Sequence, residues 1–256
     1  MKRYCIFHKN SILIKMESDG TFRLPHDERL QNLIPPSAEA MTVTLPDDDT
    51  QHITYPTILT DLPEGSYQWC DLRESYYKLS AQEYKTAGKC KELTHWNCTT
   101  RYCGRCGSTM KFSSDISKKC TGCGHEVWPL LSTAIIVLVH KGDQVLLVHA
   151  KNFRRDFYGC VAGFVETGET LEEAVRREVK EETGLTIKNI RYFSSQPWPF
   201  PCGLMIGFNA DYDAGEIKLQ YEELEFGNWF GKDNLPNLPE KLSIARQLID
   251  YWLDGH

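Results

Sequence analysis

The chain has 256 residues, of which 41% are hydrophobic and 25% charged, and its formal net charge is −6. This composition is typical of a globular protein and excludes disordered and collagen-like chains, while the length allows one large domain or two to three smaller ones. The acidic balance disfavours a protein that binds nucleic acid through a general excess of Lys and Arg.

Two features of the sequence predict a cytoplasmic protein with no membrane partner. The start of the chain lacks an apolar signal core, and the apolar run Ile135–Val139 is too short to span a bilayer. The ten cysteines favour reduced thiols or metal ligands over disulfides, because a chain of this length can bury a core without covalent cross-links.

Residues 1–95 are predicted to form an N-terminal, mainly-β domain. Apolar stretches such as Ile12–Ile14 and Thr57–Leu59 are broken by Pro35-Pro36 and by the run Asp47–Asp49, a pattern typical of short strands and loops. No catalytic motif stands out in this part of the chain.

The segment from Arg73 to Trp96 is predicted to be helical and to lead into a cysteine cluster. Its apolar positions include Tyr77, Tyr84 and Leu93. Gly88 argues against one continuous helix, because glycine destabilises a helix interior.

Residues 96–128 are predicted to form a zinc ribbon. Two Cys-x-x-Cys pairs, Cys103/Cys106 and Cys120/Cys123, are separated by thirteen residues, a spacing that lets four thiolates converge on one Zn²⁺ ion. Two redox pairs, or cysteines close together by chance, are the alternative interpretation. A module this small gains most of its folding free energy from the metal, so we expect one structural zinc per chain. The other six cysteines lack such spacing and are expected to be buried or partly buried thiols: Cys5, Cys70, Cys90, Cys98, Cys160 and Cys202.

Residues 129–256 are predicted to form one α/β domain, because strand and helix patterns are mixed along this part of the chain. The expected strands cover residues 132–139, 144–150, 186–193 and 204–212, and the expected helices cover residues 170–183 and 242–253.

The helix at residues 170–183 carries an unusual arrangement of acids. On a helical wheel Glu178 and Glu182 fall within about 60° of Leu171, on the apolar side, and Glu181 lies on the flank. Buried carboxylates four residues apart repel one another unless a cation lies between them, and oxygen ligands suit Mg²⁺ or Mn²⁺. A solvated acidic helix face is the alternative interpretation.

The same region carries a family resemblance. Gly163, five residues, Glu169, seven residues and then Arg177–Leu185 match the Nudix box at every specified position, so the chain resembles the Nudix hydrolases. The resemblance implies an α/β/α sandwich with a mixed sheet, in which Glu178 and Glu182 bind a divalent metal. Glu181 is then a further ligand or the base for the attacking water, and the carbonyl group of Ala162 completes the metal shell.

The segment Ser195–Pro201, SQPWPFP, alternates prolines with aromatic residues. Proline lacks the backbone donor of an interior strand, so we expect a stiff loop that presents its rings for stacking on a nucleotide base. The alternative is a hydrophobic loop packed under the sheet.

This segment resembles the motif of the NADH pyrophosphatase subfamily of Nudix hydrolases, which also carries a zinc ribbon before the catalytic domain. The family pattern has Ser two positions after the last proline, whereas this chain has Cys202 and then Gly203. Glu223 looks like a further metal ligand, although in isolation it would more often be a solvated surface acid. The substrate contacts implied by the resemblance are Gln196, Pro197, Trp198, Pro199, Phe200, Pro201, Cys202, Gly203, Ala245 and Trp128, with looser alignments for Asp115 and Arg73.

The resemblance implies a homodimeric enzyme that hydrolyses the pyrophosphate of NADH, and also of NAD⁺, to nicotinamide mononucleotide and AMP. It also implies removal of NAD caps from RNA 5′ ends, an activity that the acidic net charge does not favour. Two alternatives stay open: a Nudix hydrolase that prefers ADP-ribose or dinucleoside polyphosphates, and a catalytically inactive zinc-ribbon binding protein.

Overall fold

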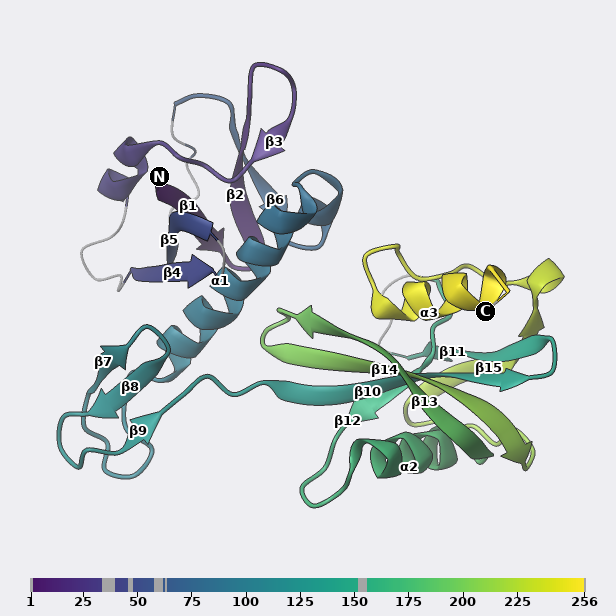
Figure 1. The fold of residues 1–256 in the computed structure, drawn as a ribbon. Coiled ribbons are helices and arrows are strands. Elements are labelled where there is room, and N and C mark those ends of the chain that lie inside the picture. Colours follow the sequence, from purple (N-terminus) through teal and green to yellow (C-terminus); the bar gives the residue numbers. More distant parts are fainter. Residues whose placement is uncertain are drawn as a thin grey trace. The chain divides into compact units, whose positions relative to one another are not determined.

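The chain folds into two compact units in the computed structural model, which describes residues 2–33, 40–45, 48–57, 62, 64–151 and 156–255. The first unit comprises Met1–Leu130 with Pro199–Cys202, and the second comprises Leu131–Trp198 with Gly203–His256 (Figure 1). A short piece of the proline-rich motif therefore belongs to the first unit, although its flanking strands belong to the second.

The first unit begins with a six-stranded sheet of order β3-β2-β1-β5-β4, with β6 paired to β2. Its strands are β1 (Lys2–His8), β2 (Ser11–Met16), β3 (Phe22–Arg23), β4 (Met41–Leu45), β5 (Asp48–Pro56) and β6 (Tyr67–Asp71). Among the described strands of this sheet, only β1 and β5 pair in parallel. The 3-10 helices η1 (Glu28–Leu33) and η2 (Glu74–Tyr77) lie in the connections. The mainly-β character predicted for this part is confirmed.

The structure confirms one of the predicted strand positions in this sheet and contradicts one of the predicted interruptions. The apolar run Ile12–Ile14 lies in β2 with at most 1% exposure, as expected. The Asp47–Asp49 run was expected to interrupt a strand, but β5 begins inside it at Asp48, where it pairs with Leu45 at the end of β4. Pro35-Pro36, Asp47 and Ile58–Leu59 lie outside the described residues.

A single helix, α1 (Ala81–Thr99), packs on this sheet, so the expected interruption at Gly88 is wrong. Ser80 caps the helix by accepting a hydrogen bond from the Glu83 amide at 3.2 Å. Buried α1 residues, among them Ala87, Cys90 and Leu93, join the core with β-strand side chains. This burial offsets the helix-propensity cost of one glycine, about 1 kcal/mol.

The zinc ribbon is a three-stranded antiparallel sheet of β7 (Met110–Ser114), β8 (Ser117–Cys120) and β9 (Glu126–Val127). Lys118 is only 1% exposed. Its ammonium group donates to the carbonyl oxygens of Asn97 and Thr100 at 3.0 and 3.2 Å and lies over the rings of Trp96 and Phe112. A cation is favoured at these last carbonyl groups of a helix, so Lys118 attaches the ribbon to the end of α1.

The second unit is built on a six-stranded mixed sheet of order β13-β14-β10-β11-β15, with β12 paired to β10 and β14 parallel to β10. Its strands are β10 (Ser132–Lys141), β11 (Gln144–Ala150), β12 (Val161–Phe164), β13 (Thr186–Trp198), β14 (Gly203–Ala214) and β15 (Leu224–Gly231), and its helices are α2 (Leu171–Thr183), the 3-10 helix η3 (Lys232–Asn234) and α3 (Ile244–Leu253). Every helix and strand predicted for residues 129–256 is present, while β12 and β15 were not predicted.

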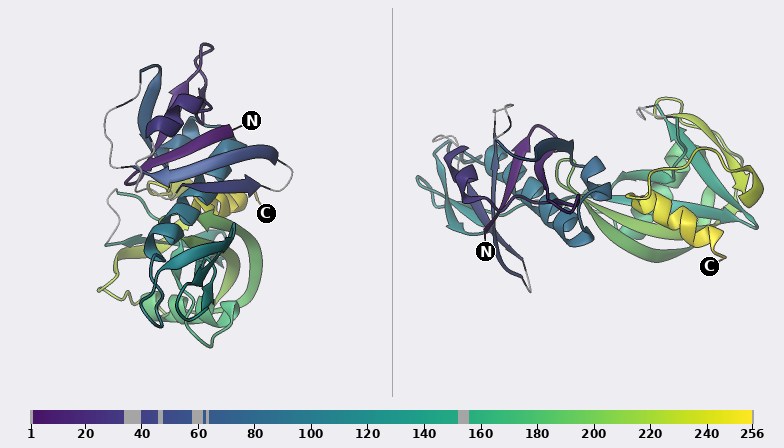
Figure 2. Two further views of the ribbon diagram at one scale, coloured as in Figure 1. Left: turned by 90° about the vertical axis from the view of Figure 1, so that its left-hand side faces the viewer. Right: turned by 90° about the horizontal axis from the view of Figure 1, so that it is seen from above.

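Helices cover both faces of this sheet because β10 alternates between two cores. Ile135 and Val137 pack with α2, whereas Ile136 and Leu138 pack with α3. The result is the expected α/β/α sandwich, in which α2 and α3 lie on opposite faces (Figures 1 and 2). In the described part of the chain, no helix is both long and apolar enough to cross a membrane.

Candidate active site

The two Cys-x-x-Cys pairs converge as predicted. The sulfur atoms of Cys103, Cys106, Cys120 and Cys123 all lie within 4.8 Å of one another. The Cys103–Cys123 and Cys106–Cys120 pairs are separated by 3.7 and 3.4 Å, close to the roughly 3.8 Å that tetrahedral Zn–S bonds of about 2.3 Å require. The backbone and side chain of Ser108 hydrogen-bond to Cys106 and lower its pKa to about 6, which favours the thiolate that binds zinc.

The remaining cysteines form no metal site in the described part of the chain. Cys5, Cys70, Cys90 and Cys160 are buried and Cys202 is half-buried, as expected. Cys98 is exposed, which corrects its prediction. It stands in the last turn of α1, and the buried side of the helix passes through Trp96 and Asn97 instead.

Helix α2 directs its acids as the wheel predicts. Thr170 and Glu173 form a capping box at its start, and Gly184 ends it with a φ of 73°. Glu178 and Glu182 are 9% and 5% exposed, on the side of the helix that packs on the sheet. The Glu181 side chain is 54% exposed, on the flank of that side.

The buried position of these acids disfavours their charge. Burial raises the pKa of Glu182 to about 8, and the charges of Glu178 and Glu223 add to the effect. Burial also raises the pKa of Glu178, while hydrogen bonding and charge from Arg177 oppose the rise. The acids of the site outnumber its one basic neighbour, Arg177, so the site favours a bound cation.

Arg177 connects the acidic helix to the loop that precedes it. Its guanidinium donates to both carboxylate oxygens of Glu169, at 3.0 and 2.6 Å, and to the Phe164 carbonyl at 2.9 Å. It also donates to Glu178 at 2.8 Å and to Glu181 at 3.1 Å. This network holds the loop and both glutamates in one geometry, so Arg177 orients their carboxylates.

Gly163 allows Glu178 to lie directly against β12. A Cβ atom at position 163 would fall 2.0 Å from the Glu178 carboxyl carbon, so any larger residue would displace the carboxylate. Ala162 precedes it on the same strand, opposite Ile136 of β10, and is exposed. The specified glycine of the box thus has a steric reason in this chain.

Glu223 lies in a loop attached to the end of α2. The Gln220 amide donates to the Glu182 carbonyl at 2.9 Å, and the Glu223 amide donates to the Gln220 carbonyl at 3.0 Å. Glu223 itself is exposed, but its charge raises the pKa values of Glu178 and Glu182, so it lies near both. Among the described residues, only the four cysteines bring their ligand atoms within 4.8 Å of one another. The carboxylates of Glu223 and of α2 are therefore spaced more widely.

The first half of the proline-rich motif corrects our expectation of a loop. Strand β13 is an edge strand, and it ends with Gln196, Pro197 and Trp198. These three residues pair with Met205, Leu204 and Gly203 of β14. An edge strand tolerates the missing donor of Pro197. The side chain of Gln196 is used within the fold, because its amide group donates to the Leu242 carbonyl and accepts from the Ile244 amide, both at 2.8 Å. These bonds hold the start of α3, next to Ala245, which is 8% exposed.

The second half of the motif turns through Pro199–Cys202 and packs inside the first unit. Phe200 contacts the N-terminal core, and the Arg73 guanidinium lies 4.4 Å from the centre of its ring. Pro199 is buried, and its Cγ lies 3.4 Å from where a Cβ of Gly88 would be. Phe200 is half-buried in a hydrophobic turn, and its stacking on a nucleotide base stays a prediction.

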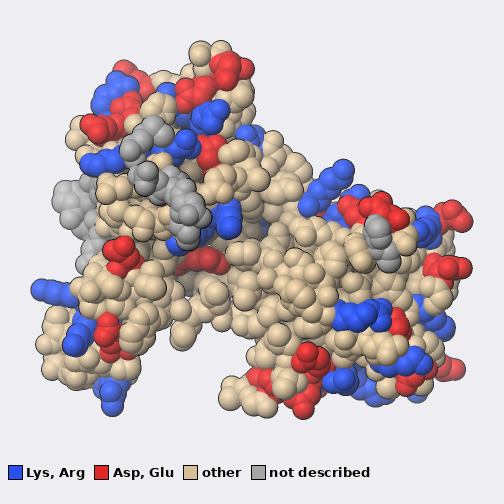
Figure 3. Space-filling view, viewed as in Figure 1, with Lys and Arg blue, Asp and Glu red and all other residues tan. Residues whose placement is uncertain are grey.

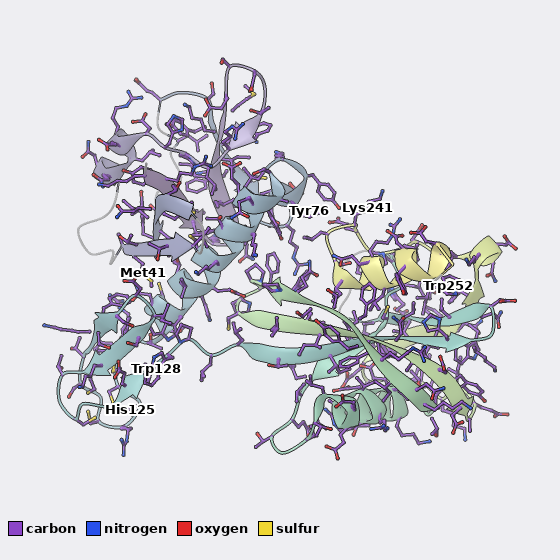
Figure 4. All side chains as sticks on the ribbon, in the orientation of Figure 1. Met41, Tyr76, His125, Trp128, Lys241 and Trp252 are labelled. Carbon is purple, nitrogen blue, oxygen red and sulfur yellow. The ribbon has the colours of Figure 1, made fainter. Side chains whose placement is uncertain are left out.

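The other predicted contacts lie apart along the chain. Trp128 is 53% exposed at the end of the ribbon (Figure 4), and Asp115 is exposed in the turn between β7 and β8. Gly203 has little room for a side chain, because a Cβ would lie 3.2 Å from the Trp198 carbonyl oxygen. Close packing under Trp198 thus accounts for the glycine where the family pattern has serine.

Sequence reasoning missed Phe164. This ring is 67% exposed on β12, directly after Gly163, and its carbonyl binds Arg177. An aromatic residue one position after the first glycine of the Nudix box was the available signal. Its backbone carbonyl, which accepts from Arg177, is the part of Phe164 that contacts the acidic network.

Three family models match the chain in order. They are the "NADH pyrophosphatase-like rudimentary NUDIX domain" at residues 1–96, the "NADH pyrophosphatase zinc ribbon domain" at residues 99–127 and the "NUDIX domain" at residues 129–252. The chain is 39% identical over 198 residues to an NAD-capped RNA hydrolase NudC of Chromobacterium violaceum, covering 77% of this chain and 75% of that relative. A NudC of Haemophilus influenzae is 44% identical over 181 residues, with 69% of each protein covered.

Solved structures support the fold alone. A Nudix hydrolase from Nitrosomonas europaea superimposes with a TM-score of 0.52 at 22% identity, covering 61% of this chain and 92% of that one. Together with the Nudix box on α2 and the four-cysteine ribbon, these similarities establish the family. The chain is a Nudix hydrolase and belongs to the NADH pyrophosphatase branch, in which a rudimentary Nudix domain and a zinc ribbon precede the Nudix domain.

Proposed function

We propose that this enzyme hydrolyses the pyrophosphate bond of NADH to reduced nicotinamide mononucleotide and AMP, with NAD⁺ and NAD-capped RNA as further substrates. The observation that carries the proposal is the pair of buried glutamates on α2, in which the pKa of Glu182 is raised to about 8. The relatives at 39% and 44% identity, which are named NAD-capped RNA hydrolases, support the choice of substrate.

The residues around this pair fit a divalent metal. Glu178 and Glu182, with Glu223 and the Ala162 carbonyl, offer only oxygen ligands, the set that suits Mg²⁺ or Mn²⁺. When bound, the metal neutralises the diphosphate and makes the attacking water more acidic. Glu181 is exposed and held by Arg177, so it is placed to bind a further metal or to accept the proton of that water.

We assign the substrate contacts to residues of the second unit and of the proline-rich motif. The half-buried ring of Trp198 stacks a base at the end of β13, where stacking contributes about 1–3 kcal/mol. Gln196 acts by holding the start of α3, so that Ala245 keeps its place beside the substrate. Phe200 and Arg73 support the turn that follows Trp198.

The organisation of the chain is proposed as three domains, residues 1–95, 96–128 and 129–256, which the ranges of the three family models support. Four cysteines in a zinc ribbon and six further thiols support a reducing compartment such as the cytoplasm.

A substrate panel tests the proposal. Initial rates with NADH, NAD⁺, ADP-ribose and diadenosine polyphosphates are measured with Mg²⁺ and with Mn²⁺. We expect the highest kcat/KM for NADH. A higher value for ADP-ribose or a diadenosine polyphosphate would assign the enzyme to another Nudix activity. The absence of any hydrolysis would leave a zinc-ribbon binding protein.

A further inference from the structure

One face of the zinc ribbon collects exposed cationic and aromatic side chains. In an antiparallel sheet, residues directly opposite one another point to the same side. Lys111 of β7 is opposite Lys119 of β8, and Tyr102 is opposite Thr109, which lies two residues before Lys111. Tyr102, Thr109, Lys111 and Lys119 therefore share one face, which we call the ribbon face. Tyr102 is 70% exposed, and both lysines are exposed.

The two lysines destabilise the isolated ribbon. Like charges directly opposite in a sheet are unfavourable. Within the described ranges of the chain, neither ammonium group forms an ion pair. Glu126 stands opposite Lys119 on the same face, and hydrogen bonds from Ser113 and Ser117 together with the charge of Lys119 lower the pKa of Glu126, so one carboxylate partly balances the two lysines. An anion bound to the ribbon face would relieve the repulsion.

Several side chains on the other face of the ribbon sheet are buried, so the ribbon face is the one more open to a ligand. Lys118 points inward and attaches the sheet to the end of α1. Met110 and Cys120 are buried on the same inner side. The amides of Arg105, Gly122 and Cys123 each donate to a cysteine sulfur at 3.4 Å, which stabilises the thiolates without cancelling their charge.

The ribbon is also basic within an acidic chain. Residues 99–127 carry the basic residues Arg101, Arg105, Lys111, Lys118 and Lys119 and only two acids, Asp115 and Glu126, whereas the whole chain has a net charge of −6. Blue side chains project from the ribbon in Figure 3. Because Lys118 is buried, the basic residues at the surface are Arg101, Arg105, Lys111 and Lys119. They place positive charge where it can meet phosphates.

We propose that the ribbon face binds the single-stranded RNA chain that follows the NAD cap, with Lys111 and Lys119 on consecutive phosphates and Tyr102 stacked on a base. This inference rests on the proposed activity toward NAD-capped RNA and assigns the surface that holds the RNA body. An exposed aromatic ring beside two cations is the combination that binds single strands without reading their sequence.

Binding is tested with 3′-labelled RNA about ten nucleotides long, measured by fluorescence anisotropy with the full chain in its zinc-loaded form. Lys111→Gln with Lys119→Gln should weaken binding and lower the slope of log affinity against log salt by about 1.4, since each phosphate contact on a single strand contributes about 0.7. Tyr102→Ala should weaken binding by at least about fivefold. The matched control is Lys2→Gln with Lys85→Gln, which removes the same charge from exposed positions of the N-terminal domain.

Hydrolysis separates this inference from the proposed function. The double ribbon variant should raise KM for NAD-capped RNA and leave kcat/KM for NADH within about twofold, with one zinc retained per chain. An unchanged RNA affinity and salt slope would overturn the inference, as would an equal loss in the Lys2/Lys85 control or an equal loss of NADH hydrolysis. If the wild-type chain cleaves neither substrate, the proposed function fails, while the anisotropy result still decides whether the ribbon face binds RNA.

Discussion

At the residue scale, Glu182 is the side chain whose surroundings most constrain the chemistry. It is 5% exposed and has Glu178 and Glu223 as negatively charged neighbours. Nearby Arg177 is occupied by Glu169, Glu178 and Glu181. A buried carboxylate in this position is unfavourable as an anion unless a cation joins it.

Replacing either buried acid tests this constraint. We expect Glu178→Gln and Glu182→Gln to lower kcat for NADH by about a hundredfold or more at saturating Mg²⁺ or Mn²⁺, because each removes a charged oxygen ligand. The thermal midpoint should not fall for Glu182→Gln, since the variant removes a destabilising charge. Glu172→Gln, on the exposed side of the same helix, is the control and should retain full turnover. Near-normal hydrolysis by a folded Glu182→Gln variant would refute the role.

The raised pKa of Glu182, about 8, predicts a pH dependence of stability. A carboxyl group whose folded pKa lies above its unfolded value contributes stability below the unfolded pKa, and this contribution is lost as pH rises through the folded pKa. Without added Mg²⁺, the free energy of unfolding should therefore fall between about pH 5 and pH 8, by an amount on the order of a few kcal/mol. Glu182→Gln should flatten the profile, and added Mg²⁺ should stabilise the protein more at pH 8 than at pH 5. Urea unfolding at each pH measures this, and parallel profiles for both proteins would contradict it.

At the scale of elements, α1 connects three parts of the first unit. Its centre packs on the N-terminal sheet, its last carbonyl groups hold Lys118 of the ribbon, and Gly88 lies against Pro199. Each contact joins segments that are distant in sequence. The helix therefore positions both the ribbon and the turn that follows Trp198.

Substitution at Gly88 tests the contact with the turn. Gly88→Ala should change the free energy of unfolding by no more than about 1 kcal/mol, because a Cβ atom would meet Pro199 at an ordinary van der Waals distance of 3.4 Å while the helix gains propensity. Gly88→Leu should destabilise by about 1–3 kcal/mol through overpacking. Urea denaturation compares the two variants, and equal stabilities would show that Pro199 does not pack there.

The attachment of the ribbon gives a second prediction at this scale. Untagged protein should contain one zinc per chain by metal analysis, and Cys106→Ser should lose it. Lys118→Met should keep the zinc but lower the free energy of unfolding by about 1–3 kcal/mol, because the carbonyl groups of Asn97 and Thr100 lose their donor. Absence of zinc from the wild-type chain would defeat the zinc assignment, and an unchanged stability of Lys118→Met would defeat the anchoring role.

At the scale of the whole molecule, exposed apolar side chains are spread over both units. Trp128, Leu130 and Leu131 lie in the segment that joins them, and Leu130 is 84% exposed. A run of exposed apolar residues favours a protein interface. The homodimer that the family resemblance implies stays a prediction.

We expect the protein to have twice the 29.4 kDa mass of one chain in solution. Light scattering coupled to size-exclusion chromatography measures the mass directly. Leu130→Glu with Leu131→Glu should shift it toward the monomer if the exposed segment lies in the interface. A monomeric wild-type protein at micromolar concentration would contradict the dimer.

The sequence by itself determined the features that depend on local spacing. The four cysteines, the faces of α2 and the positions of its acids follow from turn and helix geometry over a few residues, so spacing sufficed to predict them. The helices and the four predicted strands of the second unit follow from the same periodicity.

Only the tertiary structure decided the features that depend on distant partners. α1 continues through Gly88 because the sheet and Pro199 pack around it, and Gln196–Trp198 form a strand because β14 lies beside them. Phe200 is half-buried because Arg73, more than a hundred residues away in the sequence, and the N-terminal core pack against it. Such contacts have no signature in a short window, because their free energy comes from packing between segments that the chain brings together only on folding.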